Sequence, residues 1–358
     1  MGDPMSADRR APHYMQLPRE VVVGDGSIRE IAPMCDRLGL GDEILIVSGP
    51  RTYGLFGRPI SALLGERGYS VRHAIIESAE ASEVDRVKAI ISREGIDLVL
   101  GVGGGKSIDI AKLSSAACGA HVISVPTAAS HDGIASPYAS IKGSERPYSV
   151  RAQAPIGIVA DTEIIAKSPF RLLASGCGDS IAKYTAVRDW RLAHEVKGEY
   201  YGEYAANLAL MSSKLVMARA SSIARGEPDA IRTVVEALIS CGVAMSIAGT
   251  TRPCSGSEHL FAHALELVAK DPGLHGERCG LGTIMMAKLH GLDWRRIRAV
   301  LGRIGCPTTA SQLGVKGEEV VEALTIAHRI RPERFTILGE RGLSRDEAKR
   351  LAEETGVI

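Results

Sequence analysis

Aromatic residues and net charge are both scarce in this sequence of 358 residues. Phe, Trp and Tyr make up only 4% of the chain, so the packing of its interior must rely on aliphatic side chains. The 43 Lys and Arg residues nearly balance the 42 Asp and Glu residues, which leaves a formal charge of +1. Because such a chain has no overall field to attract DNA, RNA or an anionic membrane, we expect no nucleic-acid partner.

Paired cysteines and long apolar runs are also lacking. The seven cysteines occur singly, without a CxxC pair, which is typical of reduced thiols in a cytoplasmic protein. The opening MGDPMSADRRAPHYM contains no apolar core of the kind that a signal peptide needs. The most apolar stretch, Val234 to Gly249, is interrupted by Glu236, Ser240 and Ser246 and falls short of the roughly 20 apolar residues of a spanning helix. We therefore expect a cytoplasmic protein with no membrane insertion.

What is present is the composition of a globular protein, with 45% hydrophobic and 24% charged residues. At 358 residues the chain exceeds the size at which one hydrophobic core usually keeps growing, so two domains are expected. Up to about residue 165, short β-branched runs alternate with helical stretches. This alternation is typical of βαβ units and a parallel sheet. The expected strands are 43–49, 69–77, 97–104 and 121–127, and the expected helices are 52–68 and 83–94.

Beyond residue 165 the pattern changes to long helical stretches, at 204–226, 229–249 and 255–270. The sequence thus predicts an α/β protein with an N-terminal Rossmann-like parallel-sheet domain over 1–165 and an all-helical C-terminal domain over 166–358. Between the last expected strand and the helical half, segment 130–149 is rich in Ser, Pro and Gly. It predicts a loop or a short hairpin.

A run of three glycines, Gly103 to Gly105, connects the strand 97–104 to a helix. Glycines permit a tight turn and close approach of a ligand, and the N–H groups at a helix start attract phosphate. The spacing fits neither a Walker A loop nor the GxGxxG fingerprint. A strand-to-helix turn without a ligand is the alternative, but the entropic cost of three glycines favours a phosphate site. Asp109, near the first turn of this helix, is either a stabilising carboxylate or a cofactor ligand.

The segment PTAASHDGIASP (126–137) ends a strand with small hydroxyl residues, followed by His131 and Asp132. Turns at the carboxyl ends of parallel strands often bind ligands. An ordinary polar turn capped by Ser130 and Asp132 has the same composition. By itself this turn is weak evidence.

The helical half contains candidate metal ligands. His259 and His263 stand at i and i+4 and share one helix face, although a solvated face would also have this spacing. HEXXH is absent, which argues against a zinc peptidase. His275 lies in a loop just before another helix, and Asp179 is expected at a helix start, where an N-cap is its alternative role. One carboxylate with two imidazoles forms an open, Lewis-acid type of site.

Together these motifs identify a resemblance. The GGGKSxDxAK loop, the PTxxSxDG turn, the GCGD segment and the HLFAH helix with its later HG resemble the sn-glycerol-1-phosphate dehydrogenases. That family belongs to the superfamily of dehydroquinate synthase and iron-type alcohol dehydrogenase. The resemblance covers essentially the whole chain.

The resemblance implies site residues one by one. It assigns the metal, one Zn2+ per subunit, to Asp179, His259 and His275, and it assigns contact with substrate to Asp179, Asp132 and His263. Spacing alone does not distinguish His263 from His259. The positions that it assigns to the dinucleotide are Gly105, Lys106, Ser107, Ile108, Asp109, Thr127, Ala128, Ala129, Ser130 and Ser136. The N-terminal domain is thereby expected to bind the dinucleotide, and the C-terminal domain the metal and substrate.

The implied activity is the NAD(P)H-dependent reduction of dihydroxyacetone phosphate, a small-molecule substrate, to sn-glycerol 1-phosphate for archaeal-type ether phospholipids. A homo-oligomer is expected. The alternatives are a glycerol or alcohol dehydrogenase of the same superfamily, a lyase of the dehydroquinate synthase type, and a non-catalytic metal-binding module. The lyase would require a Glu ligand where Asp179 stands. Lys183, one turn after Asp179, is a candidate for binding the substrate's phosphate, with a surface lysine as the alternative.

The choice between NADH and NADPH depends on the end of strand 43–49. An Asp or Glu at the end of the second strand of a dinucleotide fold commonly binds the adenosine ribose and repels the 2′-phosphate of NADP. Here Gly49, Pro50 and Arg51 follow Ser48, and no carboxylate is present. We therefore expect NADPH to be accepted as well as NADH.

Overall fold

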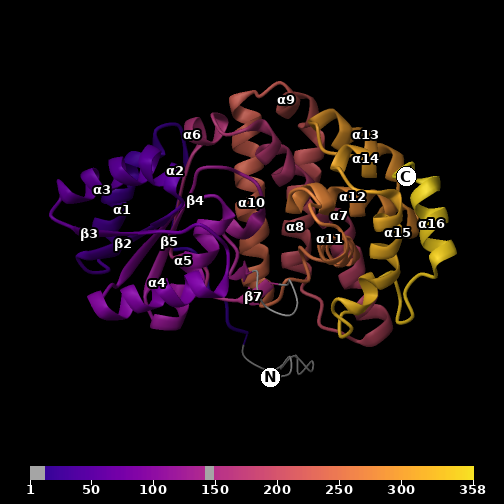
Figure 1. The fold of residues 1–358 in the computed structure, drawn as a ribbon, viewed down its shortest axis with the longest axis horizontal. Helices are drawn as coiled ribbons and strands as arrows, with labels where there is room; N and C mark the ends of the chain where they lie inside the picture. The colour runs from indigo at the N-terminus through magenta and orange to yellow at the C-terminus, as the bar shows by residue number, and fades with distance from the viewer. Residues whose placement is uncertain (1–12, 142–148) are drawn as a thin grey trace. The chain divides into compact units, whose positions relative to one another are not determined.

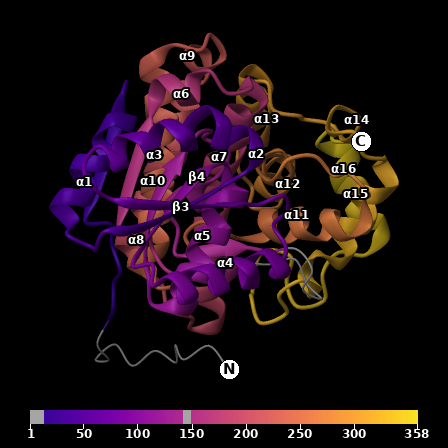
Figure 2. The ribbon, with the colours of Figure 1, turned by 60° about the vertical axis from the view of Figure 1, so that its left-hand side comes forward.

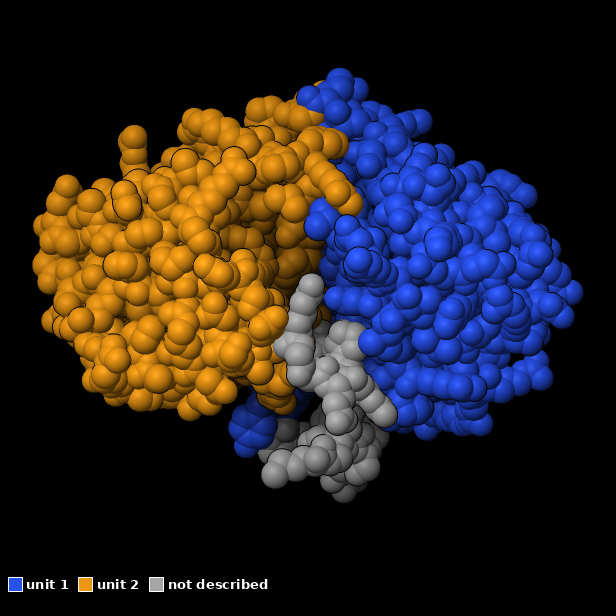
Figure 3. Space-filling model, in the orientation of Figure 1, with its two compact units in different colours: residues 1–15, 174–225, 247–358 blue, residues 16–173, 226–246 orange. Residues whose placement is uncertain are grey.

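The computed structural model describes residues 13–141 and 149–358. These residues form two compact units, coloured separately in Figure 3. The first consists of residues 16–173 and 226–246 and contains the large sheet; the second contains residues 174–225 and 247–358 and is helical. The segment 226–246 is far from the rest of the sheet unit in sequence, and nothing in its local pattern indicates that it belongs there.

The sheet of the first unit has six strands in the order β1-β8-β5-β4-β2-β3, and all its pairings are parallel. The predicted parallel α/β architecture is confirmed. The edge strand β1 and its neighbour β8 were not among the expected strands. The strand bounds are β1 (Glu20–Gly24), β2 (Glu43–Ser48), β3 (Ser70–Ile75), β4 (Leu98–Gly103), β5 (His121–Pro126) and β8 (Gly157–Asp161).

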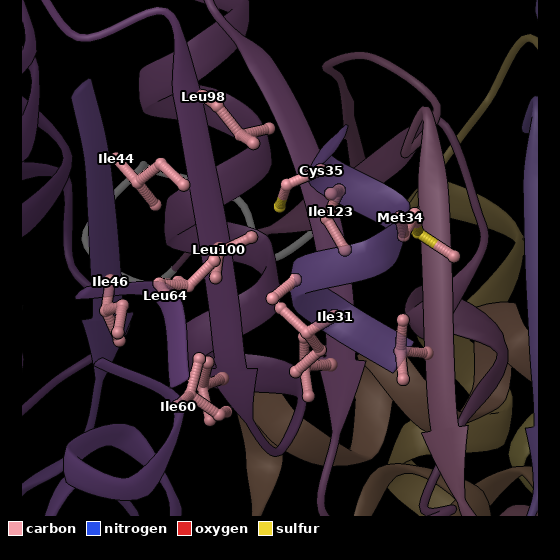
Figure 4. Close-up of a cluster of buried hydrophobic side chains, with 14 of the residues drawn as sticks. Ile31, Met34, Cys35, Ile44, Ile46, Ile60, Leu64, Leu98, Leu100 and Ile123 are labelled. Atoms are coloured by element: carbon pink, nitrogen blue, oxygen red, sulfur yellow. The ribbon is translucent and has the colours of Figure 1, made fainter. Parts of the chain in front are cut away.

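Aliphatic side chains cover both faces of this sheet. On one face, α1 (Ile31–Leu38) and α3 (Arg58–Gly65) pack Ile31 and Ile60 against Ile44, Leu98 and other residues of the strands, as Figure 4 shows. On the other face, α4 (Ala81–Glu94) and α5 (Gly105–Cys118) pack on the alternate residues of the strands. Because both faces are buried at the centre of the sheet, the strands β2, β4, β5 and β8 are largely apolar, as expected of a parallel sheet between two helical layers, whereas the edge strands β1 and β3 are partly exposed.

The order of the strands places the expected cofactor segments next to each other. From β2 the chain moves outward to β3 and then returns to the other side of β2 with β4, so the order reverses between β2 and β4. Ligands of open α/β sheets bind beyond the carboxyl ends of the strands at such a point. In the register of these two strands Ser48 pairs with Val102. Gly49 and the glycine run at Gly103 therefore emerge side by side.

The segment 130–149 contains β6 (Tyr138–Ser140) and the first residue of β7 (Ser149–Arg151). These two strands pair in antiparallel register as a short hairpin. Residues 142–148 of the expected loop lie outside the described residues. A short 3-10 helix, Asp132–Ile134, precedes β6.

The helix α10 (Pro228–Ala248) has 21 residues and matches the helix expected at 229–249 to within one residue at each end. By length and composition it is able to cross a membrane, but 67% of its apolar window is buried inside the protein, as in the core helix of a folded domain. A Cβ at Gly242 would lie 2.5 Å from the carbonyl carbon of Ala135. Glycine at this position therefore allows α10 to contact the backbone of the segment before β6.

The second unit confirms the predicted helical half. Its helices include α7 (Phe170–Lys197), α8 (Glu203–Ala218), α9 (Ala220–Ala224), α11 (Ser257–Val268), α12 (His275–Leu289), α13 (Trp294–Ile304), α14 (Ala310–Leu313), α15 (Gly317–Ile326) and α16 (Arg345–Glu354). The single helix expected at 204–226 is divided at Arg219, whose φ of −92° and ψ of 5° end α8. Helices α11 and α12 pack side by side (Figures 1 and 2).

Candidate active site

The glycine run ends β4 and begins α5, as expected, but two of its glycines are required by the protein's own side chains. Gly103 has a φ of +146°, and a Cβ there would lie 2.8 Å from Ser107 Oγ. A Cβ at Gly105 would lie 1.8 Å from the Nε2 atom of His131. A Cβ at Gly104 would meet no atom within 4 Å, so this residue faces open space. The N–H groups that begin α5 are thus available beside Gly104.

The contact between Gly105 and His131 joins the two predicted cofactor segments. His131 Nδ1 accepts a hydrogen bond from the backbone N–H of Gly133 at 2.9 Å, which fixes the ring over Gly105. Of the other predicted cofactor residues, Ser107, Ile108 and Asp109 are buried in the first turns of α5 and Lys106 is partly exposed, while Thr127, Ala128, Ala129, Ser130 and Ser136 follow β5. Ser136 Oγ accepts a hydrogen bond from the N–H of Tyr138 at 3.0 Å.

Asp109 has partners within the protein. Its Oδ1 atom lies 2.8 Å from the ammonium of Lys112, and its Oδ2 atom accepts a hydrogen bond from the N–H of Ser140 at 3.0 Å. The buried Lys112 also donates to the carbonyl oxygens of Gly133, Ser136 and Tyr138. Asp109 and Lys112 therefore hold α5 to the segment between β5 and β6. Lys112 was not among the predicted site residues.

In the helical unit, the structure brings the three predicted metal ligands together. One donor atom from each of Asp179, His259, His275 and Cys279 lies within 4.8 Å of the others. His259 Nε2 lies 3.5 Å from Asp179 Oδ1, and Cys279 Sγ lies 3.5 Å from His275 Nε2. Carboxylate, imidazole and thiol donors in a buried cluster suit a transition metal such as zinc.

Two neighbours of the three predicted ligands were not predicted. Cys279 stands one turn after His275 on α12, a spacing that could have identified it as a fourth donor. Glu258 accepts a hydrogen bond from His259 Nδ1 at 2.8 Å and also binds the Gly256 N–H and the Thr185 hydroxyl. A carboxylate on the far ring nitrogen orients the other nitrogen toward a metal.

Asp179 is not at a helix start, and this prediction was wrong. It lies within α7, one turn of helix before the lysine with which it pairs. Gly178, directly before it, does not interrupt the helix, and its role is close packing. A Cβ at Gly178 would lie 2.3 Å from the carbonyl oxygen of Gly276, and one at Gly276 would lie 1.8 Å from that of Ser175. The two glycines let α7 and α12 approach closely enough to bring Asp179 to His275.

The alternative that Lys183 is a surface lysine was also wrong. Its side chain is fully buried, and its ammonium lies 2.5 Å from Asp179 Oδ1. Burial opposes the charge of Asp179, but Lys183 and the imidazoles of His259 and His275 outweigh it and hold the pKa of Asp179 well below its usual value. Asp179 is therefore ionised, which is the form in which a carboxylate can bind a metal.

The three imidazoles differ in their protonation. Burial and the positive charges of His259 and Arg331 keep the pKa of His263 well below its usual value. Burial also lowers the pKa of His275, against the attraction of Asp179. Burial likewise acts against a charge on His259, but Cys279, Asp179 and Glu258 outweigh it and raise the pKa of His259 well above its usual value.

His263 lies outside the donor cluster but beside it. Its ring centroid is 5.9 Å from that of His275, and the residue is only 6% exposed. Its Nδ1 atom is buried and has no hydrogen-bond partner in the described part of the chain. An unpaired polar atom in such a position is costly unless a ligand satisfies it.

Comparison with known structures identifies the fold. The glycerol dehydrogenase of Schizosaccharomyces pombe has a TM-score of 0.80 at 20% identity, covering 96% of this chain and 90% of its own. An NADH-dependent butanol dehydrogenase of Thermotoga maritima has a TM-score of 0.72 at 16% identity, covering 96% and 99%. Residues 22–169 match the family described as iron-containing alcohol dehydrogenase. The fold is therefore that of the iron-containing alcohol dehydrogenase type.

Sequence relatives define the family within that class. Glycerol-1-phosphate dehydrogenases of Hyperthermus butylicus and Methanothermobacter thermautotrophicus are 53% and 51% identical to the chain. Each alignment covers 97% of this chain and 99% of the relative. That of Thermococcus kodakarensis is 51% identical over 98% of the chain. The chain belongs to the glycerol-1-phosphate dehydrogenase family.

Proposed function

We propose that this protein uses NADH or NADPH to reduce dihydroxyacetone phosphate to sn-glycerol 1-phosphate, with one Zn2+ per subunit. The observation that carries the proposal is the buried donor cluster of Asp179, His259 and His275, found in a chain about half identical to dehydrogenases named for this product. The implied role is the supply of glycerol phosphate backbones for archaeal-type ether phospholipids.

The residues present suit such a metal. Asp179 is ionised, His275 is neutral, and Glu258 orients the ring of His259. Asp179, His259 and His275 together would supply three ligands to the ion. Bound there, zinc supplies Lewis-acid polarisation of a carbonyl oxygen. Because the pKa of His259 is raised, binding of the metal requires loss of a proton from this ring.

His263 is proposed to contact substrate. Since its pKa is held low, the ring is neutral at physiological pH and its unpaired Nδ1 can form a hydrogen bond with a substrate hydroxyl. This bond would orient the substrate, so that its own hydroxyl could relay a proton from water to the former carbonyl oxygen after hydride transfer. Asp132, at the start of the 3-10 helix after β5, is proposed as the second substrate contact on the resemblance alone.

The dinucleotide is proposed to bind at the carboxyl end of the sheet. The start of α5 beside Gly104 supplies N–H groups for the pyrophosphate, and it lies at the reversal of strand order between β4 and β2. The residues from Gly105 to Asp109 begin α5, and those from Thr127 to Ser136 follow the neighbouring strand β5, which supports their proposed role. A cytoplasmic location, where the seven free cysteines stay reduced, and a homo-oligomeric state complete the proposal.

The test is an NADH-oxidation assay with dihydroxyacetone phosphate, dihydroxyacetone and glyceraldehyde 3-phosphate, followed by assignment of the product's chirality. We expect a strong preference for dihydroxyacetone phosphate and the sn-1 product, because binding of the remote phosphate holds the reacting carbonyl in place. Equal rates with dihydroxyacetone would indicate a polyol dehydrogenase, and the sn-3 product would reject the proposal. Turnover without net NADH oxidation would indicate a lyase.

A further inference from the structure

Arginines gather near His263 in the helical unit. The charges of Arg331, Arg278 and Arg334 all act on His263 and add to the effect of burial on its pKa. Arg278 belongs to α12, three residues after His275. Arg331 and Arg334 belong to the segment between α15 and α16 and are both partly exposed. The group therefore extends from a buried position beside the donor cluster to solvent.

The arginines of this region differ in their partners. Arg252 forms an ion pair with Glu199, and Arg278 forms one with Glu266 at 3.0 Å. Arg334, in contrast, donates to the carbonyl oxygen of Ser255 and to the hydroxyl of Thr251, each at 2.6 Å. No carboxylate is among its hydrogen-bond partners in the described ranges. Its positive charge is therefore held in place by neutral groups.

Two further observations favour an anion site here. Burial, and after it the nearby charges of Arg331 and Arg252, lower the pKa of Arg334 to about 9, against the attraction of Glu199 and Glu333. The Nε atom of Arg278 is buried without a hydrogen-bond partner among residues 13–141 and 149–358, as is Nδ1 of His263. Clusters of arginines with unsatisfied donors are the usual recognition group for phosphate, because the guanidinium presents donors in a planar fork.

We propose that Arg331 and Arg334, with Arg278 deeper in the same group, bind the phosphate dianion of the substrate while its carbon skeleton contacts His263. This assignment rests on the proposed function, since it names the group that distinguishes a phosphorylated ketone from a free one. It replaces Lys183 as the candidate for phosphate binding, because the ammonium of Lys183 is buried against Asp179.

The test compares kcat/KM for dihydroxyacetone phosphate and for dihydroxyacetone in the metal-loaded wild type and in Arg331→Met and Arg334→Lys. Loss of one charge-assisted hydrogen bond should lower the ratio of the two values by about 10- to 100-fold. The value for dihydroxyacetone should fall far less. Phosphite added to dihydroxyacetone should stimulate the wild type, and this activation should be lost in the variants. The matched control is Arg341→Ala, whose side chain is 88% exposed, and it should leave the ratio unchanged.

The outcomes separate the two proposals. A wild type that does not distinguish the two ketones refutes the proposed function itself. A wild type that does, with both arginine variants folded and the ratio unmoved, overturns the arginine assignment alone. Arg334 also holds Ser255 and Thr251, so if Arg334→Lys fails to fold, Arg331→Met decides the matter. Calorimetric titration with inorganic phosphate provides an independent readout: we expect weaker binding in Arg331→Met, and equal binding would contradict the assignment.

Discussion

Lys183 and Asp179 form a fully buried ion pair, with the ammonium 2.5 Å from a carboxylate oxygen that is also a candidate metal ligand. Removing one partner of a buried pair leaves an uncompensated charge, which typically costs about 3–5 kcal/mol. We therefore expect Lys183→Met to lower the unfolding free energy of the metal-free protein by this amount. Bound zinc should restore much of it, because the ion also neutralises Asp179.

Thermal unfolding with and without zinc tests this expectation. The stabilisation by zinc should be larger in Lys183→Met than in the wild type. The exposed Lys167, which pairs with Glu163 at the surface, provides the control, and Lys167→Met should change little. An unchanged midpoint in Lys183→Met would show that the buried pair is not important for folding.

The close approach of α7 and α12 gives a second prediction. Gly276→Ala would place a Cβ 1.8 Å from the carbonyl oxygen of Ser175, so the two helices must separate. We expect a loss of about 1–3 kcal/mol in stability and weaker metal binding, because Asp179 and His275 move apart. In the control Gly65→Ala the new methyl group meets no atom within 4 Å, and the helix should be stabilised slightly. Unaltered zinc affinity in Gly276→Ala would contradict this explanation of the two glycines.

The identities of the metal ligands could be inferred from the sequence, but their surroundings could not. His259 and His275 stand in recognisable motifs, and the resemblance separates His259 from His263. Asp179 was expected at a helix start, but it lies inside α7. Only the contact with Gly276 of α12 shows that Gly178, directly before it, allows the two helices to pack closely. The pairing of Lys183 with Asp179 could not be predicted, because the burial of both side chains depends on how the helices of the folded unit pack.

Features of the fold that depend on contacts between distant parts of the chain could not be predicted either. The strands β2, β4 and β5 have strong apolar runs and were predicted, as was the edge strand β3, whereas the other edge strand β1 and its neighbour β8 were not identified. The membership of 226–246 in the sheet unit depends on contacts between residues far apart in the chain, such as that of Gly242 with Ala135. Arg331 and Arg334 carry no motif, and they gain a role only from the residues that the fold places beside them.

The unequal pKa values of the imidazoles predict how stability depends on pH. His263 and His275 stay neutral in the folded protein, so below the unfolded value of about 6.5 the unfolded chain binds more protons and stability falls with falling pH. His259 has the opposite effect, since its raised pKa gives stability that is lost as pH rises through that value. Two extra protons on the unfolded chain correspond to a slope of at most about 2.7 kcal/mol per pH unit on the acid side.

Urea unfolding of the metal-free protein between pH 5 and pH 8 measures this slope. His263→Gln should reduce by about one the number of extra protons that the unfolded chain binds. The contribution of these rings to the acid-side slope of stability against pH should therefore fall by about half. His121, which is exposed at the start of β5, gives the control His121→Gln, with the wild-type slope expected. If His263→Gln retains the full slope, the ring is not held neutral in the folded state.

Coenzyme choice gives a prediction in the sheet unit. Gly49 is the N-cap of α2 (Pro50–Thr52), with a φ of −74°, and the nearest atom to a Cβ there is Thr52 Oγ1 at 3.5 Å. An aspartate is therefore accommodated without strain. We expect Gly49→Asp to shift the kcat/KM ratio toward NADH, because a carboxylate repels the 2′-phosphate of NADPH. Arg51→Ala should weaken NADPH selectively. A wild type that ignores NADPH, or variants with an unmoved ratio, would show that this strand end does not contact the ribose.

The central claim, that the buried cluster is a catalytic metal site with a substrate-binding histidine beside it, is tested most directly by the zinc content and activity of two variants. His259→Ala should lose both the bound zinc and the reduction of dihydroxyacetone phosphate, because His259 is part of the donor cluster. His263→Ala should keep about the wild-type zinc content and lose turnover, because its ring lies outside the cluster and its unpaired nitrogen faces no protein partner among the described residues. Loss of zinc in His263→Ala, or full zinc and full activity in His259→Ala, would contradict the account.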